Sequence, residues 1–301
     1  MRAESEAAAA AALLVAPAAR SVASWVAEVR GAARLDLGEV LRSRWPAFTG
    51  GAYALLAAIF VNAGLRESTT MGFTGLGRVL LALSHALVLV LPLLALMATG
   101  QVISRARDDG TLELLFSHPL TRVGYFTGVT LVRLAALALP LVLLLLVLPA
   151  AGRLLFGLAV PWAFALRTVA VGTSLLVAFC GIGMALSASV RNGAKVVVLL
   201  LLVWALAVAL LDFGLVAFLL RARVAPRAVL LLAALNPVQS ARLALLAGAD
   251  PDLSTLGPVG FWAATHLGAG RMLALGVLWP LVVGALAWTA GLRRFCRGDL
   301  V

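Results

Sequence analysis

The sequence predicts an all-α integral membrane protein with six transmembrane helices, an N-terminal amphipathic helix in the plane of the membrane, and a short charged helix on the cytoplasmic side. Of the 301 residues, 63% are hydrophobic and only 12% are charged, and the mean hydropathy is +1.06. Soluble domains are about 45–50% apolar. Long apolar runs with almost no charge recur along the chain, and arginine-rich polar segments separate them. These observations together favour a multi-pass membrane protein.

The net charge of +11 comes from 24 Lys and Arg residues against 13 Asp and Glu residues. In a soluble protein this excess would suggest nucleic-acid binding. In a membrane protein, basic residues flank the spans, where they set orientation and contact anionic lipid headgroups. We therefore expect membrane lipid as a partner, and no nucleic acid.

Residues 1–20 are expected to be an Ala-rich disordered tail. A signal peptide is the alternative, because the length fits. A signal peptide begins with a positively charged segment, however, and here Glu4 and Glu6 outnumber Arg2. The disordered tail is therefore the favoured interpretation.

Residues 21–45 predict an amphipathic helix that lies in the membrane interface. Its apolar residues fall near one helical face, namely Val22, Val26, Val29, Ala33, Leu37, Val40 and Leu41. Most of its charged residues fall elsewhere, and Trp25 and Trp45 would sit at headgroup level. A solvated helix that does not touch the membrane is the alternative.

Residues 46–293 are expected to form the six-span domain, since a span needs about 20 apolar residues. The predicted spans are 46–65, 79–104, 134–152, 168–190, 196–220 and 272–292. Two shorter apolar runs, 154–166 and 228–241, contain proline. We expect these runs to be helices or re-entrant pieces at the outer surface.

Basic residues predict the orientation of the chain. If the N-terminus is cytoplasmic, 14 basic residues fall on the inner side and nine on the outer side, as the positive-inside rule prefers. Both termini are then cytoplasmic, including a tail at 294–301. The outer side carries a long loop, 221–271, and loops of this length usually have a function or a structure of their own.

The sequence contains no catalytic motif and no cluster of metal ligands. Cys180 and Cys296 form no metal-binding spacing, and the His and Met residues are scattered. We expect no enzymatic activity and no cofactor or metal bound by this chain. The candidate intramembrane polar residues are Asp212 and His85. An ion-coupled carrier would use such groups for transport, but a paired or interfacial Asp212 and a helix–helix hydrogen bond from His85 are favoured.

The polar segment 105–122 lies between the second and third predicted spans, on the expected cytoplasmic side. It predicts a short helix, with Asp108 and Asp109 near its positive N-terminal end and Thr111 able to cap it. Its leucines and Phe116 form an apolar surface that could enter a groove on a soluble partner. A connector that rests on the membrane is the alternative.

Six short segments resemble a known family. They are G-F-T at 72–74, L-P-L-L-A-L at 91–96, D-G-T-L-E-L-L at 109–115, P-L-T-R at 119–122, L-D-F-G-L at 211–215 and L-N-P-V-Q-S-A-R-L at 235–243. With the order of spans, they resemble the ABC-2 class of ABC-transporter permeases over about residues 22–297. The L-N-P segment narrows the likeness toward the NosY-like subgroup, which serves the maturation of nitrous oxide reductase.

The resemblance implies a coupling helix at 108–116 that contacts an ABC ATPase. The coupling residues would be Asp108, Asp109, Gly110, Thr111, Leu112, Glu113, Leu114 and Phe116. It also implies two copies of this chain with two copies of the ATPase, which binds ATP and Mg, and an elbow helix at 22–45. The chain has Ala106 where relatives often have a carboxylate, so we expect the electrostatics of the ATPase contact to differ from theirs.

The resemblance further implies a periplasmic β-helix protein as a partner, met through the outer loop at Asn236, Pro237 and Arg242. We therefore expect the permease subunit of an ABC transporter in a bacterial inner membrane. It would couple ATP hydrolysis by a separate subunit to copper-site maturation of nitrous oxide reductase. The alternatives are an ABC-2 exporter of lipid, drug or polysaccharide, an ion-coupled carrier acting alone, and a passive membrane anchor.

Overall fold

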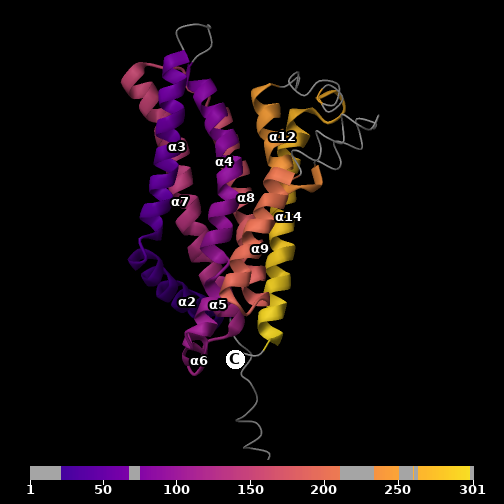
Figure 1. Cartoon of the computed structure of the whole chain (residues 1–301). Helices are drawn as coiled ribbons and strands as arrows, with labels where there is room; N and C mark the ends of the chain where they lie inside the picture. The colour runs from indigo at the N-terminus through magenta and orange to yellow at the C-terminus, as the bar shows by residue number, and fades with distance from the viewer. Residues whose placement is uncertain (1–21, 68–74, 211–233, 251–259, 261–263, 299–301) are drawn as a thin grey trace, which may run out of the picture.

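The computed structural model describes residues 22–67, 75–210, 234–250, 260 and 264–298, and each regular element within them is a helix. The elements are α2 (Val22–Arg42), α3 (Trp45–Glu67), α4 (Gly75–Thr99), α5 (Val102–Asp108), α6 (Thr111–Phe116), α7 (Arg122–Phe156), α8 (Trp162–Ser189), α9 (Gly193–Ala205), the π-helical η1 (Leu206–Leu210), α12 (Pro237–Ala249) and α14 (Gly268–Arg297). The long helices run side by side in one bundle (Figure 1). The predicted all-α class is confirmed.

Five helical stretches are long and apolar enough to cross a membrane. They are Trp45–Ala63, Leu76–Asp108, Arg122–Phe156, Trp162–Ser189 and Gly268–Arg297. They overlap five of the six predicted spans, and the chain is a multi-pass membrane protein. The remaining predicted span, 196–220, is described only as far as residue 210, by α9 and η1. Its second half lies outside the described residues, so the count of six stays a prediction.

The apolar run 154–166 is not a separate piece, contrary to the prediction. Its first residues complete α7, its last residues begin α8, and the residues between them are not helical. Gly157 ends α7 with a left-handed φ of 64°. Glycine adopts this conformation without a steric penalty, which is why it ends the helix there.

The run 228–241 overlaps α12, which is a helix but does not lie only at the surface. Its Val238, Ala241, Ala244 and Leu245 are buried, and α12 packs against α14, α8 and α4. Asn236 caps the helix and Pro237 occupies its first turn, where a missing N–H is harmless. The predicted outer loop 221–271 therefore contains a helix that belongs to the core of the bundle.

α8 is a central helix of the bundle. In its most apolar stretch 61% is buried, against 17% for α3, and it packs on α4, α7, α12 and α14. Its contact with α14 depends on small residues. A Cβ added to Gly181 would lie 2.3 Å from the carbonyl oxygen of Gly284, and one added to Gly291 would lie 2.6 Å from the Cα of Ala185. The two backbones approach so closely because no larger side chain stands between them.

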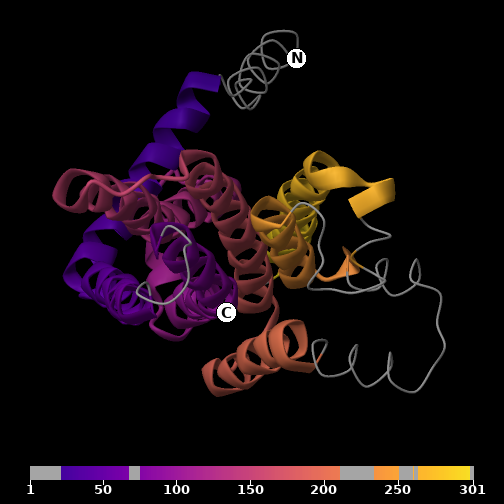
Figure 2. The same cartoon turned by 90° about the horizontal axis from the view of Figure 1, so that it is seen from above.

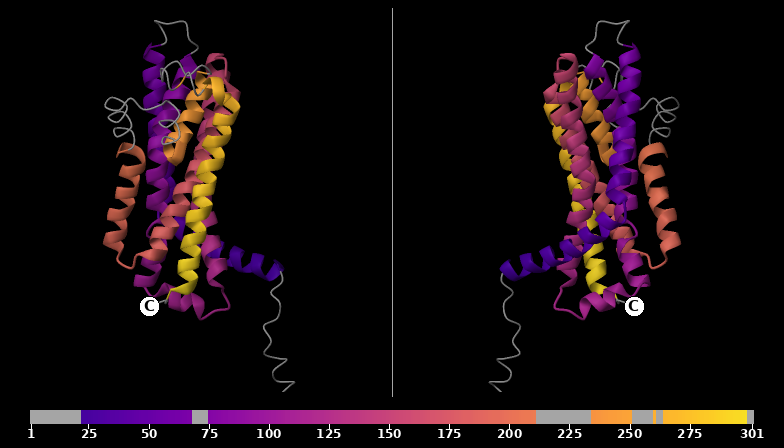
Figure 3. Two further views of the ribbon diagram at one scale, coloured as in Figure 1. Left: turned by 90° about the vertical axis from the view of Figure 1, so that its right-hand side faces the viewer. Right: turned by 90° about the vertical axis from the view of Figure 1, so that its left-hand side faces the viewer.

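The two ends of the bundle differ. α2, α5, α6 and the C-terminal end of α14 lie at one end, and α12 lies toward the other (Figure 1). α2 extends sideways from the bundle (Figure 3). Seen from above, α9 stands at the edge of the bundle (Figure 2), where the Trp204 indole N–H donates to the Leu89 carbonyl on α4 at 3.1 Å.

α2 is only partly buried. Ala32, Asp36 and Val40 are buried, on a helix that packs against α7. The exposed apolar residues of α2 are Val22, Trp25, Val26, Leu35, Leu37 and Leu41. Apolar side chains left uncovered beside a membrane-spanning bundle are typical of a helix in the membrane interface. The helix itself agrees with the sequence, and its placement in the interface stays a prediction.

Candidate functional site

The polar segment between the second and third predicted spans forms two short helices. α5 ends at Asp108, Asp109 follows as its cap, and α6 begins at Thr111. Gly110 between them has φ 68° and ψ 5° and is the N-cap of α6. The prediction of one helix over 108–116 capped by Thr111 is therefore wrong. A left-handed residue breaks the helix, and glycine takes that conformation most readily.

α6 has an outward face and an inward face. Asp108, Asp109, Gly110, Thr111 and Glu113 are all exposed. Leu114 is 72% exposed, whereas Leu112 is fully buried. The apolar surface expected to enter a partner is thus divided, because Leu112 turns into the chain's own core and Leu114 turns outward. The outward face is acidic and has a single large aliphatic side chain.

The inward face of α6 packs on a cluster of aromatic rings. Phe116 meets Tyr125 edge-on with the ring centroids 5.9 Å apart, and it lies 6.1 Å from Phe295. Phe295 also packs against Phe126, at 5.6 Å. These rings come from α6, α7 and α14, and pairs at such distances stabilise by about 0.5–1.5 kcal/mol beyond their burial. α6 is therefore attached to two of the long helices.

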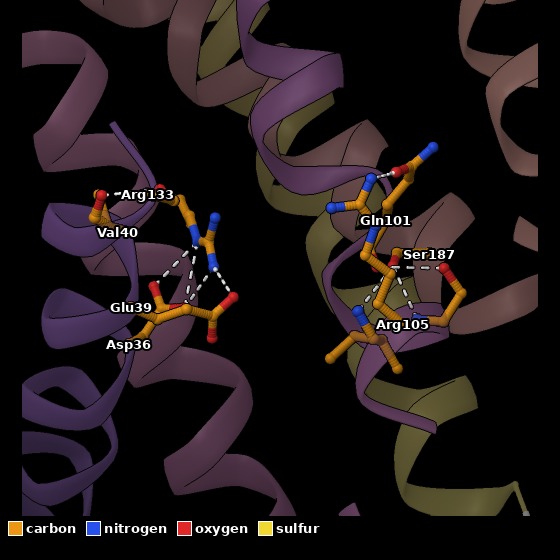
Figure 4. A network of polar contacts seen from close by, with 10 residues as sticks. Asp36, Glu39, Val40, Gln101, Arg105, Arg133 and Ser187 are labelled. Atoms are coloured by element: carbon orange, nitrogen blue, oxygen red, sulfur yellow. Dashed lines mark hydrogen bonds and ion pairs between the residues drawn. The ribbon is translucent and has the colours of Figure 1, made fainter. Parts of the chain in front are cut away.

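Ser187 of α8 holds the start of α5. Its Oγ accepts hydrogen bonds from the backbone N–H groups of Ile103 at 2.8 Å and Ser104 at 3.3 Å (Figure 4). These N–H groups have no partner within a helix that begins at Val102. A buried side chain from another helix thus replaces the N-cap that Gln101 does not provide.

α2 is tied to the start of α7 next to α6. Thr121 caps α7 by accepting from the Gly124 N–H at 3.1 Å, and its hydroxyl donates to the Glu28 carboxylate. The backbones come close at Gly128, where an added Cβ would lie 2.8 Å from the Val29 carbonyl oxygen. Gly124 and Gly128 form a G-x-x-x-G pattern, a typical sequence for close helix packing.

Further along the same contact, Asp36 of α2 pairs with Arg133 of α7. The guanidinium donates from Nη2 to Asp36 Oδ1 at 2.7 Å and from Nε to Oδ2 at 3.0 Å (Figure 4). Both side chains are mostly buried, at 5% exposure for Asp36 and 11% for Arg133. Burial raises the pKa of the Asp36 carboxyl above its ordinary value, although the hydrogen bond and charge of Arg133 act to lower it. The pair fixes the register of α2 on α7 with little net stabilisation.

The start of α7 is also joined to the end of α14. Arg122 donates from Nη1 to the backbone carbonyls of Phe295 at 3.1 Å, Cys296 at 2.9 Å and Gly298 at 2.7 Å. The last carbonyls of a helix lack partners within it, and a cation there also meets the negative end of the helix dipole. The residues beside α6 thus bind α7 to both α2 and α14.

The residues predicted to contact an outer partner lie at or beside α12. Asn236 is 5% exposed, its Oδ1 accepts from the Val238 N–H at 3.0 Å, and its Nδ2 donates to the Ala207 carbonyl at 2.6 Å. Asn236 is thus used inside the fold, joining α12 to η1, and it is not available on the surface. Pro237 and Arg242 are half-buried, and their role in an outer contact stays a prediction.

The two predicted intramembrane polar residues have different outcomes. A ring nitrogen of His85 bonds to the Leu81 carbonyl at 2.8 Å, and Ser84 donates to the same carbonyl at 2.7 Å. Both bonds lie within α4, so the expected helix–helix hydrogen bond is replaced by bonds to the preceding turn. Asp212 lies outside the described residues. Among the residues that the structure describes, no group of His, Cys, Asp and Glu is arranged to hold a metal ion.

The sequence did not single out Ser187 or the partnership of Asp36 with Arg133. The Gly124–Gly128 pattern was a readable signal for the α2–α7 contact. Arg133 in an otherwise apolar run was a second signal, because such a charge is seldom buried unpaired. No pattern near Ser187 in the sequence predicts its role, since the N–H groups that it binds lie more than 80 positions away in the chain.

Comparison with known proteins agrees with this architecture. The sequence model of the family described as ABC-2 family transporter protein matches residues 9–300. A "Probable ABC transporter permease protein NosY" from Stutzerimonas stutzeri is 30% identical over 272 residues, 87% of this chain and 93% of that protein. A protein of the same name from Pseudomonas aeruginosa is 30% identical over 267 residues, 81% of this chain and 94% of that protein. Five apolar membrane helices and a family match over nearly the whole length show that the chain belongs to the ABC-2 family of ABC-transporter permeases.

Proposed function

We propose that this permease couples ATP hydrolysis by a separate ABC ATPase subunit to movement across the membrane, and that the α5–α6 turn is the contact. Membership of the family implies the ATPase partner. The observation that carries the proposed contact is the divided surface of α6. Its exposed side offers Asp108, Asp109, Glu113 and Leu114 to a partner, while its buried side is built into the bundle.

The connections of the turn support transmission of a movement. Leu112 and Phe116 pack with rings from α7 and α14, and Ser187 of α8 bonds to the start of α5. A rigid displacement of α6 would therefore act on α7, α8 and α14 together. A loosely attached connector would absorb the same displacement by local rearrangement, and so it would not couple the two sides.

Replacing residues 110–113 by a Gly/Ser linker tests the contact. The full chain would be co-expressed with its ABC ATPase subunit, and co-purification and ATPase turnover would be measured. We expect both to fall strongly. Glu113→Gln tests the outward charge alone, and Arg153→Gln is its control, since Arg153 is an exposed charged residue at the far end of α7. Unchanged co-purification with unchanged turnover in the linker variant would refute the contact.

The names of the relatives support a narrower proposal. Two permeases named NosY cover most of this chain, and the L-N-P segment at 235–237 resembles that subgroup. We infer that two copies of the chain and two ATPases form the transporter, with both termini cytoplasmic in a bacterial inner membrane. It would transmit conformational change to a periplasmic β-helix protein during copper-site maturation of nitrous oxide reductase, and Pro237 and Arg242 would lie on that side.

Complementation tests this narrower role. The chain and its ATPase would be expressed in a denitrifying host that lacks its own NosY permease, and the copper content and activity of its nitrous oxide reductase would be measured. We expect both to be restored by the wild-type chain and not by the linker variant. An enzyme that stays copper-deficient with the wild-type pair, when the pair itself hydrolyses ATP, would favour an ABC-2 exporter of another substrate.

A further inference from the structure

An arginine-lined cavity lies between α5, the α8–α9 turn and the end of α14. It has a volume of about 440 Å³. The basic residues around it are Arg107, Arg191, Arg293, Arg294 and Arg297, and Ala188, Ser189, Ala290 and Gly298 complete its lining. No carboxylate is among these lining residues. Five guanidinium groups thus share one concave space without a lining carboxylate to balance them.

The buried side-chain atoms of Arg107 are the main observation that indicates a ligand in this cavity. Its Nε and Nη1 atoms are buried and have no hydrogen-bond partner among the described residues. A buried donor of a charged group that is left unsatisfied is destabilising. Arg191 repels the charge of Arg107, and the attraction of Asp108 is the smaller effect, so an anionic ligand would stabilise the site in two ways.

We propose that the cavity binds the phosphate of an anionic phospholipid headgroup from the adjacent leaflet. Guanidinium groups bind phosphate oxygens through paired, charge-assisted hydrogen bonds. The cavity lies at the ends of two membrane-spanning stretches, Leu76–Asp108 and Gly268–Arg297, where headgroups would lie. Basic pockets between transmembrane helices on that side are suited to such headgroups.

The position of the cavity suggests what the bound headgroup does. Arg107 belongs to α5, beside the proposed ATPase contact, while Arg293, Arg294 and Arg297 belong to α14. One phosphate bound by both sets would link α5 to α14 independently of the bond from Ser187 of α8. The lipid would thus stabilise the arrangement that holds the coupling turn. The site does not depend on which substrate the transporter serves.

Thermal unfolding of the purified full chain in neutral detergent tests the site. Phosphatidylglycerol, phosphatidylcholine and inorganic phosphate would be titrated separately. We expect phosphatidylglycerol to raise the unfolding temperature with saturation, and phosphatidylcholine to have little effect. Arg107→Gln should weaken the apparent affinity for phosphatidylglycerol about tenfold, as expected for the loss of a hydrogen bond between charged groups.

The control is Arg105→Gln, because Arg105 lies on the same helix, is exposed and does not line the cavity. If Arg107→Gln fails to fold, the exposed pair Arg294→Gln and Arg297→Gln replaces it. Equal lipid affinity in the cavity variants and the control would overturn the proposal. So would full stabilisation by inorganic phosphate alone, which would indicate a free-anion site. Loss of ATPase co-purification without any lipid preference would assign the arginines to a protein contact instead.

Discussion

Two pairs of helices in this molecule meet over glycines, and they are held in different ways. α8 and α14 cross with Gly181 against Gly284, and the hydrogen bond recorded across that contact is from the Ser174 hydroxyl to the Gly276 carbonyl, at 3.3 Å. α2 and α7 meet over Gly124 and Gly128 and add carboxylates that bind Thr121 and Arg133.

The difference follows from where each pair lies. α8 and α14 are membrane-spanning stretches, and inside a bilayer an unpaired polar group is expensive, so close packing of small residues sets most of the fit of the two helices. α2 extends sideways from the bundle and lies against only part of α7 (Figure 3). The ion pairs of Arg133 with Asp36 and Glu39 specify where α2 docks. Close packing therefore positions α8 on α14, whereas charged groups position α2 on α7.

The largest expected effect comes from breaking the charged contact on one side only. Arg133→Met alone should destabilise the chain by about 3–5 kcal/mol, because it leaves the buried Asp36 carboxylate unpaired. Asp36→Leu alone should cost less, because Glu39 Oε1 still lies 3.4 Å from Arg133 Nη2. The double variant should lie within about 1 kcal/mol of the wild type, since apolar residues of similar volume replace the pair. Thermal unfolding in detergent measures both. Single variants as stable as the double variant would show that the pair is not buried in the membrane environment.

Gly284→Ala should have the next largest effect. The new Cβ would meet the Val177 carbonyl oxygen at 2.7 Å, and overpacking of this kind costs about 1–3 kcal/mol. Gly270→Ala on the same helix is the control, because nothing lies within 4 Å of its added Cβ. That control should be neutral or slightly stabilising, since alanine is the better helix former. Equal unfolding temperatures for the two variants would contradict close packing of α8 on α14.

Ser187→Ala should have the smallest effect on stability and a larger one on coupling. It leaves the N–H groups of Ile103 and Ser104 without their acceptor, which costs about 1–2 kcal/mol. ATPase stimulation should fall further than stability does, because α5 loses its attachment to α8. Thr173→Ala on the same helix is the control, since the Thr173 hydroxyl bonds within α8, to the Val169 and Ala170 carbonyls. Unaltered ATPase stimulation in Ser187→Ala would show that the hydrogen bonds from Ser187 to α5 are not needed for coupling.

Local composition predicted the long helices well, because a charge-poor run of about 20 residues has few other stable states in a membrane. It predicted less well where helices break. A turn at Gly100 and Gln101 interrupts the predicted span 79–104, and the helix that follows is capped by Ser187 from α8. That cap is a tertiary contact, and no pattern around residue 100 encodes it.

In the polar segment 105–122, too, local sequence predicts some features and tertiary packing decides others. Its acidic residues and its exposure follow from the sequence, but its division into α5 and α6 depends on the left-handed conformation of Gly110. The leucines were indistinguishable in the sequence, and only packing against Phe116, Phe295 and their neighbours decides that Leu112 is buried and Leu114 is exposed. For Asn236, a turn residue in an expected outer loop, the structure instead shows a buried helix cap.

Site-specific cross-linking tests the proposed contact most directly. In a chain with Cys180 and Cys296 replaced, a cysteine at Leu114 would be paired with a cysteine scan of the ATPase surface. We expect high-yield disulfides from Leu114→Cys that change with nucleotide, and none from Leu155→Cys, an equally exposed position at the far end of α7. Cross-links from Leu155→Cys together with none from Leu114→Cys would place the ATPase at the wrong end of the bundle and contradict coupling through α6.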